Sequence, residues 1–73
     1  MVHPITLHSK EDVLNLNNLA TKQKFNLSVS NGSIIVDAKS LLALFSLIGK
    51  TVNLVASDSA DPVAFAAIIN KLN

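Results

Sequence analysis

An asparagine-glycine pair between two short apolar segments is the feature that most constrains this 73-residue chain. Before it, residues 25–30 alternate apolar and polar side chains without a break, as in a strand that buries one face. Asn31-Gly32 is a dipeptide that tolerates positive φ at both central positions of a type I′ turn. We therefore expect the chain to reverse there and to form a tight β-hairpin with residues 33–36.

Two further segments have the alternation of strands. Residues 5–8 form the first, and Pro4 before them suits a strand start or a sheet edge. Residues 51–56 form the last, and they place three apolar side chains on one face, namely Val52, Leu54 and Ala56. The chain is therefore expected to contribute four strands to one sheet.

Two amphipathic helices flank these strands. Ser9 stands three residues before Asp12, so its hydroxyl is expected to cap a first helix that ends at Gln23 or Lys24. Its apolar stripe comprises Val13, Leu16, Leu19 and Ala20. Asp61 followed by Pro62 predicts the start of the last helix. The stripe of that helix comprises Phe65, Ile68, Ile69 and Leu72.

A third helix is expected between the hairpin and the last strand, over residues 41–48, with Gly49 closing it. Its six large apolar side chains are too many for one buried stripe. At about 100° per residue they divide into two adjoining arcs. One arc holds Leu41, Leu42 and Phe45, and the other holds Leu44, Leu47 and Ile48. We expect the second arc to pack inward and the first to remain exposed.

Composition narrows the function. Six basic and five acidic side chains are scattered singly, so the sequence has no basic cluster that would favour binding to nucleic acid. Cysteine is absent, so disulfides and thiolate metal sites are excluded. The apolar run at residues 41–48 is far too short to span a bilayer, and no secretory signal is recognisable. We therefore expect a cytoplasmic protein without a membrane segment.

Hydrophobic residues make up 49% of the chain, which is more than so small a core can bury. We therefore expect part of the apolar surface to bind a protein partner.

These segments predict a single α+β domain over residues 1–73, in the order β-α-β-β-α-β-α. An antiparallel four-stranded sheet with three helices on one face buries all the apolar stripes together, as an open-faced sandwich whose other face is polar.

Residues 25–47, Phe-Asn-Leu-Ser-Val-Ser-Asn-Gly-Ser-Ile-Ile-Val-Asp-Ala-Lys-Ser-Leu-Leu-Ala-Leu-Phe-Ser-Leu, resemble the middle of the histidine-containing phosphocarrier (HPr) family of the bacterial sugar phosphotransferase system. The order of elements is also that of this family. The resemblance implies an HPr-like fold with the sheet order 1-4-2-3.

Phosphate-carrying members of that family have a histidine at the start of the first helix, in a Gly-Leu-His-x-Arg-Pro-Ala setting. Here the helix starts with residues 9–13, Ser-Lys-Glu-Asp-Val, without histidine, arginine or proline. Its two acidic residues would repel a phosphoryl group. The interpretation is a divergent member whose carrier site is degenerate. The alternative is that His8, in Leu-His-Ser-Lys, is the phosphoacceptor. His3, near the terminus, is interpreted as a solvated residue.

Ser40 resembles the serine that a dedicated kinase phosphorylates in Gram-positive phosphocarriers, and Lys39, Leu41 and Leu42 match its setting. A phosphate there would add nearly two negative charges at a helix start. Alternatively, Ser40 only caps the helix.

In the family, exposed apolar residues of the second helix bind phosphotransferase proteins and a catabolite-control transcription factor. By position, Lys39, Leu41, Leu42 and Phe45 would take that role. The same patch could instead mediate self-association, as a structural homo-oligomeric subunit. No cofactor, metal site or enzymatic constellation is recognisable.

Overall fold

The computed structural model describes residues 1–72. Its strands are β1 (Val2–Thr6), β2 (Leu27–Asn31), β3 (Ile34–Asp37) and β4 (Thr51–Ala56). Its helices are α1 (Lys10–Thr21), α2 (Leu41–Phe45) and α3 (Pro62–Lys71). The order β-α-β-β-α-β-α agrees with the expectation from the sequence.

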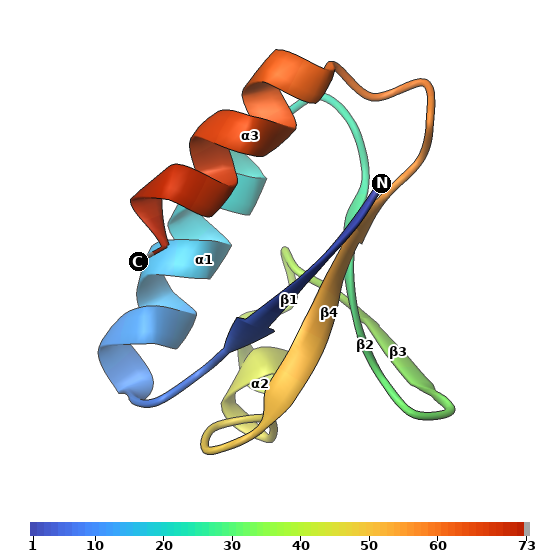
Figure 1. The fold of residues 1–73 in the computed structure, drawn as a ribbon. Helices are drawn as coiled ribbons and strands as arrows, with labels where there is room; N and C mark the ends of the chain where they lie inside the picture. Colours follow the sequence, from blue (N-terminus) through green and yellow to red (C-terminus); the bar gives the residue numbers. More distant parts are fainter. Residues whose placement is uncertain (73) are drawn as a thin grey trace.

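The four strands form one antiparallel sheet in the order β1-β4-β2-β3, as the resemblance implies. Figure 1 shows α1 and α3 side by side over one face of this sheet, with α2 near its lower end. Leu54 of the central strand β4 is fully buried and lies opposite both His3 of β1 and Val29 of β2. The core is therefore a single layer between the sheet and its helices.

The apolar stripes meet in that layer. All four stripe residues of α1 are buried, and so are the three inward residues of β4. From α3, Phe65 and Ile68 are buried, while Ile69 and Leu72 pack against the core from its margin. The start of α3 is also as expected, since Asp61 Oδ1 accepts a hydrogen bond from the Val63 backbone N–H at 2.9 Å.

The hairpin turn is shifted by one residue from the expected type I′ turn. Asn31 pairs with Ile34, so the two loop residues are Gly32 and Ser33. Gly32 has φ +64, and no residue other than glycine has a positive φ within residues 1–72. Positive φ at the first central position alone is typical of a type II′ turn. The prediction of Asn31-Gly32 as the turn centre was therefore wrong, whereas the hairpin itself is confirmed.

The first strand, which was predicted over residues 5–8, and the first helix also differ from the prediction. Strand β1 begins three residues earlier, at Val2, and ends at Thr6. Pro4 lies inside it, which the sheet tolerates because β1 is an edge strand. Helix α1 begins after Ser9 as expected, but the Ser9 hydroxyl makes no capping bond. The helix ends at Thr21, before the expected Gln23 or Lys24.

Helix α2 is shorter than the expected helix over residues 41–48. It ends at Phe45, and three tighter backbone bonds follow, from the N–H groups of residues 46, 47 and 48 to the carbonyls three positions earlier. Such turns rotate each residue by more than an α-helix does. Leu44 and Leu47 remain buried, but Ile48 is turned outward. Gly49 then reverses the chain with φ +88, where a side chain would be strained.

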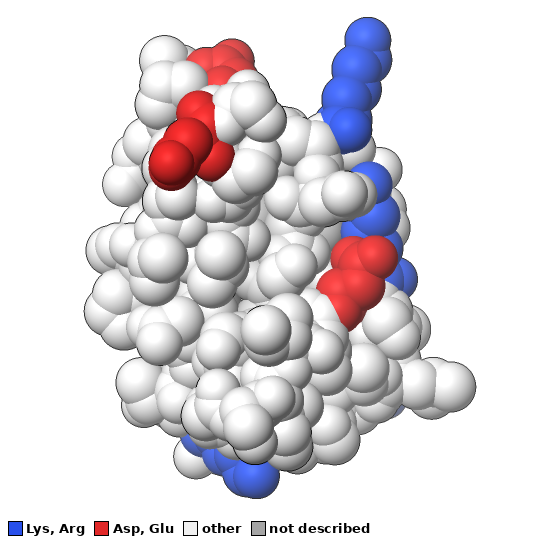
Figure 2. Space-filling model, turned by 90° about the vertical axis from the view of Figure 1, so that its right-hand side faces the viewer, with Lys and Arg blue, Asp and Glu red and all other residues white. Residues whose placement is uncertain are grey.

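The other face of the sheet carries no helix within the described residues. Figure 2 looks at the side of the molecule away from α1 and α3, where lysine and acidic side chains lie at the margins of a broad uncharged area. Strand alternation and register place hydroxyl and amide side chains here, including Ser28, Ser30 and Asn53, together with Pro4 and Val55. Exposed Val2 and Ile35 interrupt the expected polar character of this face.

Candidate functional site

His8 lies in the short connection between β1 and α1, exposed and one residue before Ser9. Its backbone N–H donates to Asp12 Oδ2 at 2.8 Å, so the carboxylate folds back over the start of α1. This bond differs from the predicted cap, in which the Ser9 hydroxyl accepts from N–H groups of the first helical turn. This local geometry places an acidic group beside the His8 backbone.

A hollow of about 460 Å³ adjoins His8. Its walls are formed by β1, the start of α1, one residue of β4 and the end of the chain: His3, Pro4, Ile5, Thr6, His8, Asp12, Thr51 and Leu72. The Thr6 and Thr51 hydroxyl oxygens lie 2.9 Å apart. Both histidines of the chain therefore line one hollow.

The participation of His3 was missed in the sequence, where it was interpreted only as a solvated residue near the terminus. Because β1 starts at Val2, His3 and Ile5 alternate onto the same face of one strand. His3 is half-buried and lies opposite Leu54. The period-two relation of these two residues was the available signal, but it required the correct strand start.

The electrostatics of this hollow do not provide an arginine clamp. All six basic residues of the chain are lysines, and Asp12 is the only charged side chain, apart from any charge on the histidines, among the lining residues. A lysine acts as a point charge and lacks the bidentate fork of arginine. Within residues 1–72, no group of three or more His, Cys, Asp or Glu side chains is placed to hold a metal ion.

Ser40 immediately precedes α2 and is exposed. Its backbone is fixed, since its N–H donates to the Asp37 carbonyl at 2.9 Å and its carbonyl accepts from the Leu44 N–H at 3.1 Å. Its side chain makes no capping hydrogen bond, so the alternative that the hydroxyl caps α2 is wrong. The exposed hydroxyl thus lies on a residue whose backbone N–H and carbonyl are both hydrogen-bonded.

Lys39, the residue before Ser40, is half-buried, and its side chain is directed to the loop after α1. Its ammonium group donates to the Gln23 carbonyl at 3.3 Å, and its backbone N–H donates to Asp37 Oδ1 at 2.9 Å. Asn17 of α1 donates to the carbonyl of Ala38 at 3.3 Å. These bonds connect the segment before α2 to helix α1 and to the loop that follows α1.

The apolar residues of α2 are only partly displayed. Leu42 is 84% exposed, whereas Leu41 and Phe45 are half-buried and pack against the core. Ile48, expected on the inward arc, is 38% exposed. We call Leu41, Leu42, Phe45 and Ile48 the α2 surface. Its most exposed member is the leucine two positions after Ser40.

Backbone pairing brings the connection that carries His8 to the turn after α2. The Leu7 N–H donates to the Lys50 carbonyl at 3.1 Å, and the Gly49 N–H donates to the Leu7 carbonyl at 2.6 Å. In Figure 1 the start of α1, α2 and this turn all lie at the lower end of the molecule. The histidine hollow and the α2 surface therefore occupy the same end of the fold.

Comparison with known proteins identifies the fold. No family model matches the chain, and no curated protein matches it. Among solved structures, a crystal structure of HPr-C-His from Thermoanaerobacter tengcongensis superposes with a TM-score of 0.75, over 99% of this chain and 90% of that chain. The sequences are 22% identical over this match. With its 1-4-2-3 sheet and its helices, the chain has an HPr-like fold.

Proposed function

We propose that this protein is an HPr-like protein-binding and regulatory module of the phosphotransferase type, with a degenerate carrier histidine site. The observation that carries the proposal is the juxtaposition of a free, exposed hydroxyl at Ser40 with a leucine side chain that is 84% exposed two residues later. It acts in the cytoplasm without a cofactor or enzymatic activity of its own. Its partners are phosphotransferase proteins, a serine kinase or a transcription regulator.

The α2 surface is suited to docking because some of its side chains pack against the core while Leu42 is exposed to solvent. Leu41 and Phe45 pack against the core, which fixes the orientation of the helix. Leu42 projects from that fixed base, so a partner that buries it gains apolar contact with little ordering cost in this protein. Complete burial of a leucine side chain is worth about 2 kcal/mol.

Phosphorylation at Ser40 would change this surface electrostatically. The phosphate would place about two negative charges beside Leu42 at pH 7. The first N–H groups of a helix lack intrahelical acceptors and can bind the phosphate oxygens. An apolar partner surface would then have to desolvate this charge, so we expect phosphorylation to exclude that partner.

Incubation with the serine kinase of a phosphotransferase system should add one phosphate, about 80 Da, to the wild-type protein. The readout is intact-mass spectrometry with ATP present. Ser46→Ala is the matched control, because the Ser46 hydroxyl is also exposed but already donates to the Ala43 carbonyl at 2.6 Å. We expect Ser46→Ala to gain the phosphate and Ser40→Ala to gain none. No gain in the wild type, or a gain in Ser40→Ala, contradicts the regulatory role.

The second candidate function is phosphate carriage by His8, and the hollow that it shares with His3 favours it. Against it, Asp12 lines the same hollow and would repel the phosphoryl group. Phosphoenolpyruvate and the first enzyme of the phosphotransferase system provide the test. We expect no acid-labile label on the wild type. A label on the wild type that His8→Ala abolishes would establish the carrier function and overturn the degenerate-site proposal.

A structural homo-oligomer is the third candidate, favoured by the uncharged side of the molecule in Figure 2. Sedimentation over a concentration series distinguishes it from a docking module. We expect a monomer throughout, because the α2 surface contains only one leucine that is mostly exposed. A stable oligomer that Ser40 phosphorylation leaves unchanged would favour the structural role.

A further inference from the structure

A second hollow lies at the opposite end of the sheet from His8. Strand β4 runs from Thr51, in the wall of the histidine hollow, to Ala56, in the wall of the second one. The second hollow has a volume of about 510 Å³, enough for a small metabolite. Its walls come from the loop between α1 and β2, the paired ends of β2 and β4, and the loop before α3: Lys24, Phe25, Asn26, Ser28, Val55, Ala56, Ser57 and Ser59.

Most of the polar side chains in this lining have no hydrogen-bond partner in the described part of the protein, and the two serines of the loop before α3 pair only with each other. Within residues 1–72, the side chains of Lys24, Asn26 and Ser28 make no hydrogen bond or ion pair. The Ser57 and Ser59 hydroxyl oxygens lie 2.8 Å apart. One of these hydroxyls donates to the other, so the accepting hydroxyl keeps its own proton for a ligand. The residues that line this hollow thus offer four donors: an ammonium, an amide and two hydroxyls.

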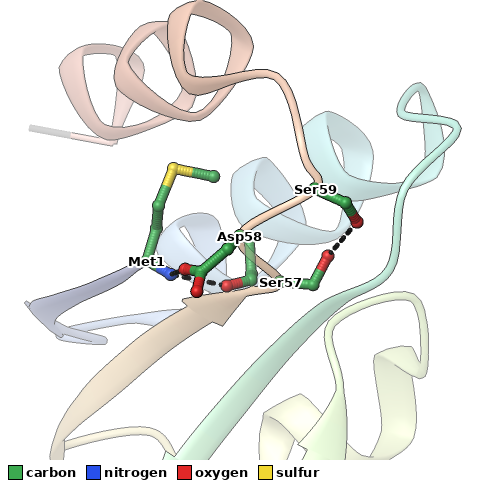
Figure 3. A network of polar contacts seen from close by, with 5 residues as sticks. Met1, Ser57, Asp58 and Ser59 are labelled. Atoms are coloured by element: carbon green, nitrogen blue, oxygen red, sulfur yellow. Dashed lines mark hydrogen bonds and ion pairs between the residues drawn. The ribbon is translucent and has the colours of Figure 1, made fainter.

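Among residues 1–72, no carboxylate lines this hollow, although Asp58 lies between the two serines in the chain. Figure 3 shows the reason: Asp58 lies beside Met1, while the Ser57 and Ser59 side chains meet on the other side of the loop. The Met1 ammonium group is 3.4 Å from Asp58 Oδ1 and donates to the Ala56 carbonyl at 2.7 Å. The acidic group is thus directed away from the serine pair.

From this arrangement we infer a binding site for a small phosphate monoester. A phosphate dianion offers three terminal oxygens in different directions, which suits a hollow whose donors come from three separate segments. The ammonium of Lys24 supplies the opposite charge. Phe25, Val55 and Ala56 form an apolar wall for the carbon skeleton of the ester. Neither the Ser40 hydroxyl nor the histidine hollow contributes to this site.

Titration of the ¹⁵N-labelled protein with glycerol 3-phosphate, followed by amide chemical shifts, tests this site. We expect saturable shifts at Asn26, Ser57 and Ser59, with a dissociation constant on the order of 1 mM because the donors are solvent-exposed. Inorganic phosphate should shift the same amides more weakly, and neutral glycerol should not shift them. All titrations are made at equal ionic strength, because exposed charges are screened by salt.

Two variants separate this site from a general charge effect. Lys24→Met should weaken binding about tenfold through the loss of one charge-assisted hydrogen bond. Lys22→Met is the matched control, since Lys22 is an exposed lysine two residues away that does not line the hollow, and it should bind within about twofold of wild type. The double variant Ser57→Ala/Ser59→Ala should also bind more weakly, whereas either single variant leaves one hydroxyl free to donate. Equal weakening by the two lysine variants, shifts centred on His8, or no saturable shift overturns the inference.

Discussion

Leu54→Ala is expected to lower the free energy of unfolding by about 3 kcal/mol, because it removes a fully buried side chain from the central strand β4 and leaves a cavity. A single domain of this size typically has a total stability of only about 5 kcal/mol. Urea unfolding followed by circular dichroism is the measurement. The variant should lose more than half of its stability and be partly unfolded at physiological temperature.

Leu42→Ala is the matched control, since it deletes the same atoms from a side chain that is 84% exposed. It should change the free energy of unfolding by no more than about 0.5 kcal/mol. Similar losses for Leu42→Ala and Leu54→Ala would mean that Leu42 is packed, which would remove the basis for a docking surface on α2.

Leu42→Asp is expected to weaken binding of a phosphotransferase partner by about thirtyfold, equivalent to about 2 kcal/mol. A charged group would replace the most exposed apolar side chain of the α2 surface and would have to be desolvated in the complex. Calorimetric titration with the first enzyme of the phosphotransferase system measures the effect. The fold should not change, because Leu42 contributes little to the core.

Leu14→Asp provides the comparison, because Leu14 lies on α1 outside the buried stripe and is 42% exposed. Its binding should remain within about twofold of wild type if docking is confined to the α2 surface. Equal loss in both variants would place the partner on a wider surface that includes α1, and wild-type affinity in Leu42→Asp would remove α2 from the interface.

The parts of the fold that the sequence predicted well depend on local chemistry. Residues 51–56 form the expected strand because alternation over six residues determines both its conformation and its buried face. The start of α3 follows from Asp61 and Pro62, which satisfy the helix terminus without help from elsewhere. Of the arc that was expected to remain exposed on the second helix, only Leu42 is mostly exposed, whereas Leu41 and Phe45 pack against the core.

The parts that the sequence did not predict depend on distant partners. The start of β1 at Val2 comes from pairing with Val55, and this pairing holds Pro4 inside the strand. The short α2 is followed by Gly49, whose N–H bonds to Leu7 across the fold. The pairing of Val2 with Val55 places His3 in the hollow with His8. The bond between Gly49 and Leu7 brings that hollow near α2. Residue spacing indicates the placement of His3 only once the strand start is known, and it does not show the contact between Gly49 and Leu7.

The most direct measurement of the proposed function is a map of partner contact on the ¹⁵N-labelled protein. The first enzyme of the phosphotransferase system is titrated in, and amide signals are followed for the unphosphorylated and the Ser40-phosphorylated forms. We predict changes concentrated at residues 40–48 in the unphosphorylated form and loss of these changes after phosphorylation. Changes confined to the helix-free side of the sheet, or equal changes in both forms, would contradict a docking surface on α2 that is regulated through Ser40.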